Sequence, residues 1–296
     1  MAKIQRPYAQ SRFVNRSGKQ LEFVRLGEPI SLGFDLYHGL LRVSWPWFLV
    51  LVSVGYIAIN TLFALAYLAG GDDIAGGQPG SFADAFFFSV QTLGTLGYGV
   101  LSPRTFYTNV VVCVEVFVGL LGSAVATGLL FARFSRPTAR VLFSNMAVIT
   151  LREGMPTLMF RAANQRRNQI LEANLQVTLL MDEYSREGQF MRRFYDLKLV
   201  RGRSPIFALT WTAMHVIDET SPLYSATPES LRNIQAELIV TLTGIDETVY
   251  QTIHARHSFV TEEILWNMRF VDIVSQTPDG QRTIDFSRFH EVVSDA

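Results

Sequence analysis

The sequence predicts a membrane protein in which two membrane-spanning helices and a short re-entrant helix precede an all-β domain. Three observations support this fold class. Two long apolar segments, at about 47–69 and 107–131, carry almost no charge. A shorter apolar segment with a Gly-rich end lies between them, at 81–99. After residue 136 the sequence changes to short β-branched runs separated by turn residues, which is typical of a β-sandwich.

The chain is organised in four parts. Its 296 residues suggest about two domains. We expect a cytoplasmic N-terminal segment at 1–30, an interfacial slide helix at 31–44, a transmembrane pore domain at 45–136 and a cytoplasmic β-sandwich domain at 137–296. Lys and Arg together number 26 and Asp and Glu also number 26. This balance gives no basic excess, so we expect no nucleic-acid partner.

The two long apolar segments can cross a bilayer. From Trp47 to Ala69 there is no Asp, Glu, Lys or Arg. A helix of that length, at about 1.5 Å per residue, exceeds the roughly 30 Å hydrocarbon core. The second segment, Thr105–Phe131, contains one charged residue, Glu115.

Basic residues predict the orientation of the spans. They gather before the first span and after the second, whereas only Arg104 lies between the spans. Lys and Arg favour the cytoplasmic side. We therefore expect a multi-pass integral membrane protein with both termini in the cytoplasm.

Two shorter segments complete the membrane part. Ser31–Ser44 mixes apolar and charged residues directly before the first span, which is typical of a helix lying along the membrane interface. Ser81 begins a mostly apolar helix, Phe82–Gln91, with Asp84 placed as in a capping box. This helix is about half the length needed to cross a bilayer, so it must enter and return.

The pentapeptide Thr95-Leu96-Gly97-Tyr98-Gly99 follows this helix. Four copies of such a loop around one axis present rings of backbone carbonyl oxygens that replace the hydration shell of K⁺. Gly97 and Gly99 permit the positive φ angles that turn carbonyls toward the axis. We expect K⁺ to bind at Thr95, Leu96, Gly97 and Tyr98, with the side chains of Leu96 and Tyr98 packed behind the filter.

The second span supplies the other pore candidates. Glu115 is costly in lipid, so we expect it to face the protein and support the filter. Gly119 is a candidate hinge, and Ser123 and Thr127 are candidates for the cavity wall, with close helix packing as the alternative. Phe131 is a candidate gate, since four aromatic rings can form a dewetting constriction. An interfacial aromatic is the competing interpretation.

The sequence has no signature of catalysis. It contains no dinucleotide-binding glycine motif, no P-loop and no zinc-ligand spacing. We expect no enzyme activity and no cofactor apart from K⁺ ions in the filter.

Several segments together resemble the prokaryotic inward-rectifier potassium channels of the KirBac type. The resemblance spans nearly the whole chain, in TLGYG, SRFVNRSGKQLEFVRLG, ARFSRPTARVLFS, FRAANQRRNQILEANLQVTLL, SPIFALTWTAMHVIDETSPLY and HARHSFVTEEILWNMRF. It implies a homotetramer, an immunoglobulin-like cytoplasmic domain, passive K⁺ transport and modulation by anionic, phosphoinositide-type lipids. It also implies the inner membrane of a bacterium.

The resemblance suggests further site residues and some departures. Arg133 and Arg136 match basic positions that contact lipid headgroups in eukaryotic members. Ser44-Trp45-Pro46 replaces a eukaryotic Arg-Trp-Arg, which leaves Trp45 as a lipid-contact candidate and puts activation by phosphoinositide in question. Gln91 stands at a position that supports the filter. In eukaryotic members a Glu–Arg ion pair stabilises the filter, and here Gln91 and Leu101 replace it. Acidic positions of strong rectifiers are here occupied by Ser123, Gln189 and Thr243, so we expect weak rectification.

Two alternatives to a K⁺-selective channel stay open from the sequence. One is a poorly selective cation channel on the same scaffold, because the Glu–Arg pair beside the filter is absent. A non-conducting lipid or ligand sensor is the other alternative, and the intact filter motif argues against it.

Overall fold

The computed structural model describes residues 36–71, 73–135, 137–276, 279–280 and 282–295. The expected N-terminal segment 1–30, the first part of the slide helix and Arg136 lie outside these residues. The chain divides into two compact units, of which one contains residues 27–136 and the other contains residues 137–296.

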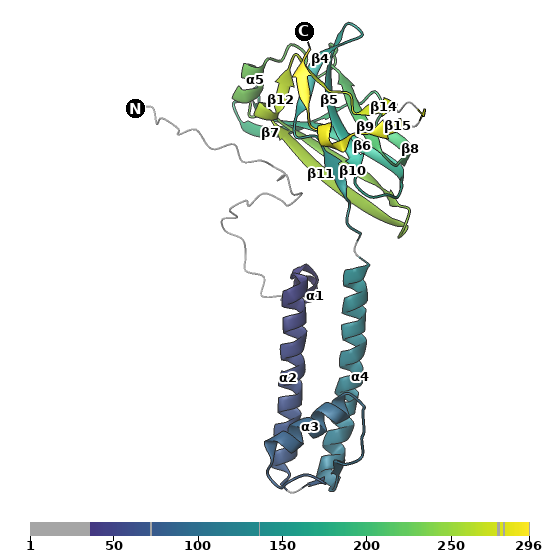
Figure 1. Cartoon of the computed structure of the whole chain (residues 1–296). Helices are drawn as coiled ribbons and strands as arrows, with labels where there is room; N and C mark the ends of the chain where they lie inside the picture. The colour runs from purple at the N-terminus through teal and green to yellow at the C-terminus, as the bar shows by residue number, and fades with distance from the viewer. Residues whose placement is uncertain (1–35, 72, 136, 277–278, 281, 296) are drawn as a thin grey trace. The chain divides into compact units, whose positions relative to one another are not determined.

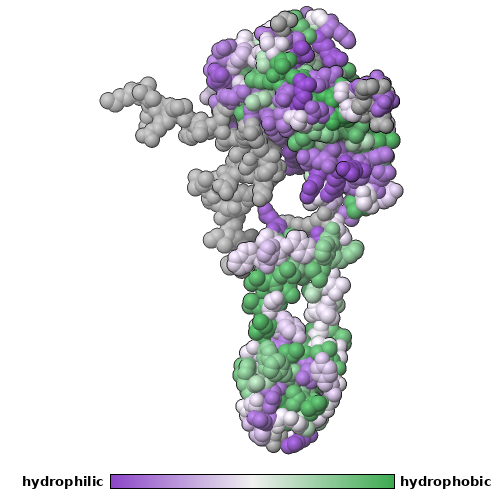
Figure 2. Space-filling view, in the orientation of Figure 1, coloured by the Kyte–Doolittle hydropathy of each residue, from purple (hydrophilic) through white to green (hydrophobic). Residues whose placement is uncertain are grey.

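The described residues of the membrane unit form four helices and one pair of short strands. The helices are α1 (Leu36–Arg42), α2 (Trp45–Ala69), α3 (Phe82–Leu93) and α4 (Phe106–Phe134). Helices α2 and α4 are long and apolar enough to cross a membrane, as the sequence predicted. Figure 1 shows α3 between them, at the end away from α1. The flanks of α2 and α4 are covered mainly with apolar residues in Figure 2.

Local capping explains where α3 and its flanking turn begin. The Ser81 side chain accepts a hydrogen bond from the Asp84 amide at 3.2 Å, as the sequence predicted. The reciprocal half of the expected capping box is wrong, because Asp84 accepts from the Gln78 amide at 2.8 Å. Asp84 therefore ties the preceding turn to the first turn of the helix. The short strands β1 (Ile74–Ala75) and β2 (Ser102–Pro103) pair at the two ends of the loop region.

The C-terminal unit is a sandwich of two five-stranded sheets. One sheet has the order β11-β10-β6-β7 with β8 against β6, and the other has the order β12-β4-β5-β3 with β9 against β5. Their bounds are β3 Val141–Phe143, β4 Ala147–Arg152, β5 Met155–Asn164, β6 Ile170–Tyr184, β7 Phe190–Leu197, β8 Arg203–Phe207, β9 Thr210–Val216, β10 Glu237–Asp246, β11 Gln251–Val260 and β12 Ile264–Trp266. Helix α5 (Pro228–Asn233) lies before β10.

Alternation of apolar side chains forms the core between the two sheets. Along β10 buried residues alternate with half-buried ones after the first two positions. One apolar cluster contains buried residues from both sheets, among them Phe160 of β5, Leu179 of β6 and Leu242 of β10. Apolar burial of this kind is the main stabilising contribution to such a domain.

Several short elements lie outside the two sheets. They are the hairpin-like pairs β13 (Met268–Phe270) with β16 (Val292–Ser294) and β14 (Val274–Gln276) with β15 (Arg282–Ile284), and the 3₁₀ turns Thr261–Glu263 and Phe286–Arg288. After β15 the chain continues into the 3₁₀ turn Phe286–Arg288. Strands β8 and β9 are adjacent in the sequence but belong to different sheets.

Candidate functional site

The loop after α3 alternates between residues with positive φ and residues without it. Thr95, Gly97 and Gly99 have positive φ angles of 54°, 57° and 82°. The intervening Leu96 and Tyr98 are not among the residues with positive φ. Alternation of backbone handedness directs successive carbonyl groups to the same side of the chain. That is the arrangement a carbonyl-lined ion path requires.

Helix α3 fixes the start of this loop. The Leu96 amide donates to the carbonyl of Gln91 at 2.8 Å, and the Thr95 amide donates to the carbonyl of Thr92 at 3.0 Å. Gln91 thus contacts the filter candidate through its backbone. Residues 95–100 are all exposed in the single chain, with the Tyr98 side chain 71% exposed. The expected packing of Leu96 and Tyr98 is therefore not supplied by their own chain.

A buried polar cluster joins the three membrane helices beside this loop. Glu115 of α4 accepts from the Tyr67 hydroxyl of α2 and lies 2.5 Å from the Ser89 hydroxyl of α3. Ser89 also donates to the amide oxygen of Asn60 on α2 at 3.0 Å. Asn60, Ser89 and Glu115 have no exposed surface. Glu115 therefore faces protein, and its contact with α3 supports the helix that carries the filter candidate.

Gly119 provides a second contact between α4 and α3, one turn after Glu115. A Cβ atom at Gly119 would lie 2.6 Å from the carbonyl oxygen of Leu93, the last residue of α3. Helix α4 continues through Gly119 without interruption. Gly119 therefore permits a close approach of two backbones. This is a reason for glycine at this position that differs from the expected hinge.

The other inner-helix candidates lie on a different face of α4. At 3.6 residues per turn, Arg133 follows Glu115 by about five turns and returns to the same face. By the same geometry Phe131 lies about 160° from that face. Phe131 is 72% exposed in the single chain. The hydroxyls of Ser123 and Thr127 donate to the carbonyls of Leu120 and Ser123, each at 2.8 Å.

Arg133 contacts α1 and the start of α2. Its guanidinium donates to the carbonyls of Leu40 and Val43, the latter at 2.7 Å. It also lies over the rings of Trp45 and Phe48, at 4.7 and 4.4 Å from the centroids. Cation–π contacts of this kind add to the hydrogen bonds. The two lipid-contact candidates Arg133 and Trp45 therefore contact one another, and both terminal nitrogens of Arg133 bond carbonyls of its own chain.

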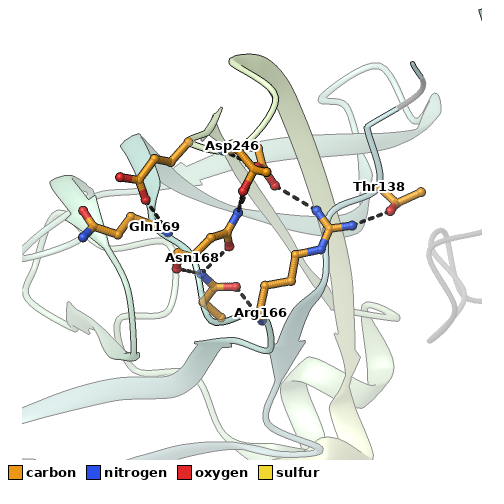
Figure 3. A network of polar contacts seen from close by, with 8 residues as sticks. Thr138, Arg166, Asn168, Gln169 and Asp246 are labelled. Atoms are coloured by element: carbon orange, nitrogen blue, oxygen red, sulfur yellow. Dashed lines mark hydrogen bonds and ion pairs between the residues drawn. The ribbon is translucent and has the colours of Figure 1, made fainter. Parts of the chain in front are cut away.

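A polar network surrounds Asp246 in the C-terminal unit (Figure 3). Its buried carboxylate accepts from Arg166 and the Asn168 amide, each at 2.8 Å, and from the Thr248 backbone at 2.9 Å. Burial alone opposes the charge, but these bonds together hold the pKa of Asp246 below its usual range. Arg166 also donates to the Thr138 hydroxyl at 2.8 Å. The network thus ties the chain just after Pro137 to the ends of β5 and β10.

The comparisons with known proteins agree with this geometry. Residues 47–136 match the Ion channel family, and residues 141–295 match the Inward rectifier potassium channel C-terminal domain family. The chain is 50% identical over 287 residues to the Inward rectifier potassium channel Kirbac3.1 of Paramagnetospirillum magnetotacticum, with 97% of each chain covered. This chain belongs to the inward rectifier potassium channel family.

Members of the family from animals are similar over most of the same length. The human ATP-sensitive inward rectifier potassium channel 12 is 30% identical, with 95% of this chain and 70% of that protein covered. The human Inward rectifier potassium channel 18 is 29% identical over the same shares. The membership confirms the expected combination of a two-span channel domain with a β-rich C-terminal domain.

Sequence reasoning missed the partners of Glu115. Tyr67 and Ser89 contact Glu115 and Asn60 contacts Ser89, yet all three lie in segments that are otherwise mainly apolar. A polar residue inside a span is costly unless it faces a partner. Asn60 within the first span was therefore the signal that could have indicated a polar contact between the helices.

Proposed function

We propose that the chain forms a homotetrameric channel that conducts K⁺ selectively and passively across the membrane. The observation that carries this proposal is the alternation of positive φ at Thr95, Gly97 and Gly99, which directs successive carbonyls to one side. Four such loops around an axis would supply rings of oxygen ligands for dehydrated K⁺. The exposed state of residues 95–100 in the single chain is what assembly around an axis would require.

The proposal extends to gating, regulation and orientation. Phe131, on the face of α4 opposite its contacts with the other helices, would form the constriction at the cytosolic end, below a cavity lined by Ser123 and Thr127. Anionic lipid headgroups would act near Arg133, Arg136 and Trp45, with both termini in the cytoplasm. Potassium ions would be the only bound ions that transport needs. The expected absence of enzyme activity belongs to the same proposal.

Flux through reconstituted channels tests the proposal. In liposomes with a K⁺ gradient, the wild-type chain should carry K⁺ and show a reversal potential that favours K⁺ over Na⁺. Gly97→Ala should abolish or degrade K⁺ selectivity, because the φ of 57° at Gly97 disfavours any residue with a Cβ. The matched control is Gly55→Ala in α2, where a Cβ meets no atom within 4 Å.

Each result has a definite meaning. Selective K⁺ flux in the wild type and the control, lost in correctly assembled Gly97→Ala tetramers, supports the filter assignment. Unchanged selectivity in Gly97→Ala would overturn that assignment. Wild-type flux without K⁺ selectivity would favour a poorly selective cation channel, and no flux from an assembled wild-type tetramer would favour a sensor.

A further inference from the structure

The Ser89 hydroxyl lies close to two side-chain oxygens at once. The Ser89 hydroxyl oxygen lies 3.0 Å from the side-chain oxygen of Asn60 and 2.5 Å from a carboxyl oxygen of Glu115. A serine hydroxyl has a single hydrogen to donate. It can satisfy one of these two oxygens, so the other contact needs a hydrogen from elsewhere.

The orientation of Asn60 decides which contact uses the Ser89 hydrogen. The Asn60 nitrogen donates to the carbonyl of Tyr56 at 2.8 Å. A backbone carbonyl can only accept, so this bond fixes the amide nitrogen on the Tyr56 side and the amide oxygen on the Ser89 side. The amide oxygen also only accepts. Ser89 must therefore donate to Asn60, and its hydrogen is not available to Glu115.

The other neighbours of Glu115 supply no charge to balance a carboxylate. Its second carboxyl oxygen accepts from the Tyr67 hydroxyl, and Tyr67 is the titratable group in contact with it among the described residues. Helix α3 presents the uncharged Ser89 to it. Between Trp47 and Ala132 the sequence has one basic residue, Arg104, and no histidine. A fully buried carboxylate without a cation is costly, more so in a membrane.

We propose that Glu115 is a neutral carboxylic acid that donates its proton to Ser89. The result is a one-directional chain of hydrogen bonds, from Tyr67 to Glu115, from Glu115 to Ser89, from Ser89 to Asn60 and from Asn60 to the Tyr56 carbonyl. Each donor group in this series of hydrogen bonds then has one acceptor. Glu115 is a positioning residue, because it holds α3 against α2 and α4 without placing a fixed charge behind the filter.

Infrared spectroscopy of the full-length channel in liposomes tests the protonation state directly. The difference spectrum between the wild type and Glu115→Gln at neutral pH should contain the carbonyl stretch of a protonated acid, which lies above the carboxylate stretches. Tyr67→Phe should shift this band to higher frequency without removing it, because the acid carbonyl loses the bond from Tyr67. A difference confined to carboxylate bands would overturn the proposal, as would a band that Tyr67→Phe leaves unmoved.

Function provides an independent readout, and only this part rests on the proposed K⁺ flux. Glu115→Ala should lower K⁺ flux and the melting temperature of the tetramer, and Glu115→Gln should restore most of both, since its amide also donates and accepts. Glu115→Asp is the matched control, shorter by one methylene and still acidic. If aspartate restores both properties fully and glutamine restores neither, the proposal of an uncharged Glu115 is wrong. If the protein does not conduct K⁺, the wild type will show no flux, but the expected infrared result stays the same.

Discussion

The carbonyl oxygen of Leu93 lies against the α-carbon of Gly119, so close that a Cβ there would be 2.6 Å from it. Leu93 is the last residue of α3, and Gly119 lies in the first half of α4. Ser89 and Glu115 meet one turn earlier on the same two helices. Two contacts thus fix both the rotation and the height of α3 on α4, and with them the position of the loop 95–99.

Gly119→Ala should destabilise this junction. The added methyl group meets backbone rather than a flexible side chain, and overpacking of this kind costs about 1–3 kcal/mol. We expect a lower melting temperature of the assembled protein and a smaller K⁺ flux. Gly122→Ala is the control, because a Cβ there meets nothing within 4 Å in the chain. Equal melting temperatures for the two variants would show that the close approach is absent in the assembled protein.

Phe131→Ala should raise basal K⁺ flux. Phe131 is a large exposed aromatic on the face of α4 turned away from Glu115, and its removal would widen and hydrate a constriction formed by four rings. Flux from liposomes without added lipid regulator measures the effect. Phe134→Ala serves as the comparison, because the Phe134 ring is 73% exposed and packs in a tilted geometry against Trp45, with centroids 4.8 Å apart. A larger effect at Phe134 than at Phe131 would place the gate elsewhere.

Arg133 variants separate a structural role from a lipid-binding role. The forked guanidinium bonds two carbonyls of the α1 region at once, which a lysine cannot reproduce although it keeps the charge. We expect Arg133→Lys and Arg133→Ala to change basal flux to a similar extent. If Arg133→Lys behaves as wild type and Arg133→Ala alone loses the response to anionic lipid vesicles, the headgroup contact is the dominant role.

Asp246→Asn should lower the stability of the C-terminal domain by about 2 kcal/mol, the order expected for charged hydrogen bonds. Because its pKa is lowered in the folded state, the wild-type Asp246 contributes fully at neutral pH. That contribution is lost as the pH falls through the lowered pKa. The stability difference between wild type and Asp246→Asn, measured by chemical denaturation, should therefore shrink below about pH 4. A difference that is constant with pH would contradict the assignment.

Spermine should block outward current only shallowly, because the cavity candidate Ser123 carries no charge. Ser123→Asp would add four carboxylates to a confined path in the tetramer, where charge interactions are stronger than in bulk water. We expect the half-blocking spermine concentration to fall on the order of tenfold. Ser123→Asn is the uncharged control. Steep block of the wild type at micromolar spermine would show that the charge argument is wrong.

The sequence predicted the parts of this fold in which one physical constraint dominates. The absence of charge from Trp47 to Ala69 is enough for a span, and Ser81 is enough to start α3. Strand β5 escaped prediction because nearly all its residues are buried on both faces, which removes the alternation.

Among the candidate site residues, those identified by a local motif were predictable, and those whose roles depend on distant contacts were not. The filter motif is local, so five adjacent residues were sufficient to find it. The roles of Gly119 and Arg133 depend on contacts with Leu93, Leu40 and Val43, which are far away in the sequence. No local pattern encodes such distances. The burial of Glu115 was predictable from cost alone, but its partners were not.

The single chain encloses the support of the filter but leaves the filter itself exposed. Asn60, Ser89 and Glu115 are fully buried without any partner subunit, whereas residues 95–100 have no cover of their own. In a homotetramer, a subunit with a damaged filter would therefore still present an intact scaffold to its neighbours. It would enter mixed tetramers beside normal subunits and silence them. Coexpression of Gly97→Ala with wild type would then suppress current far beyond the share of mutant chain, as a dominant-negative allele does.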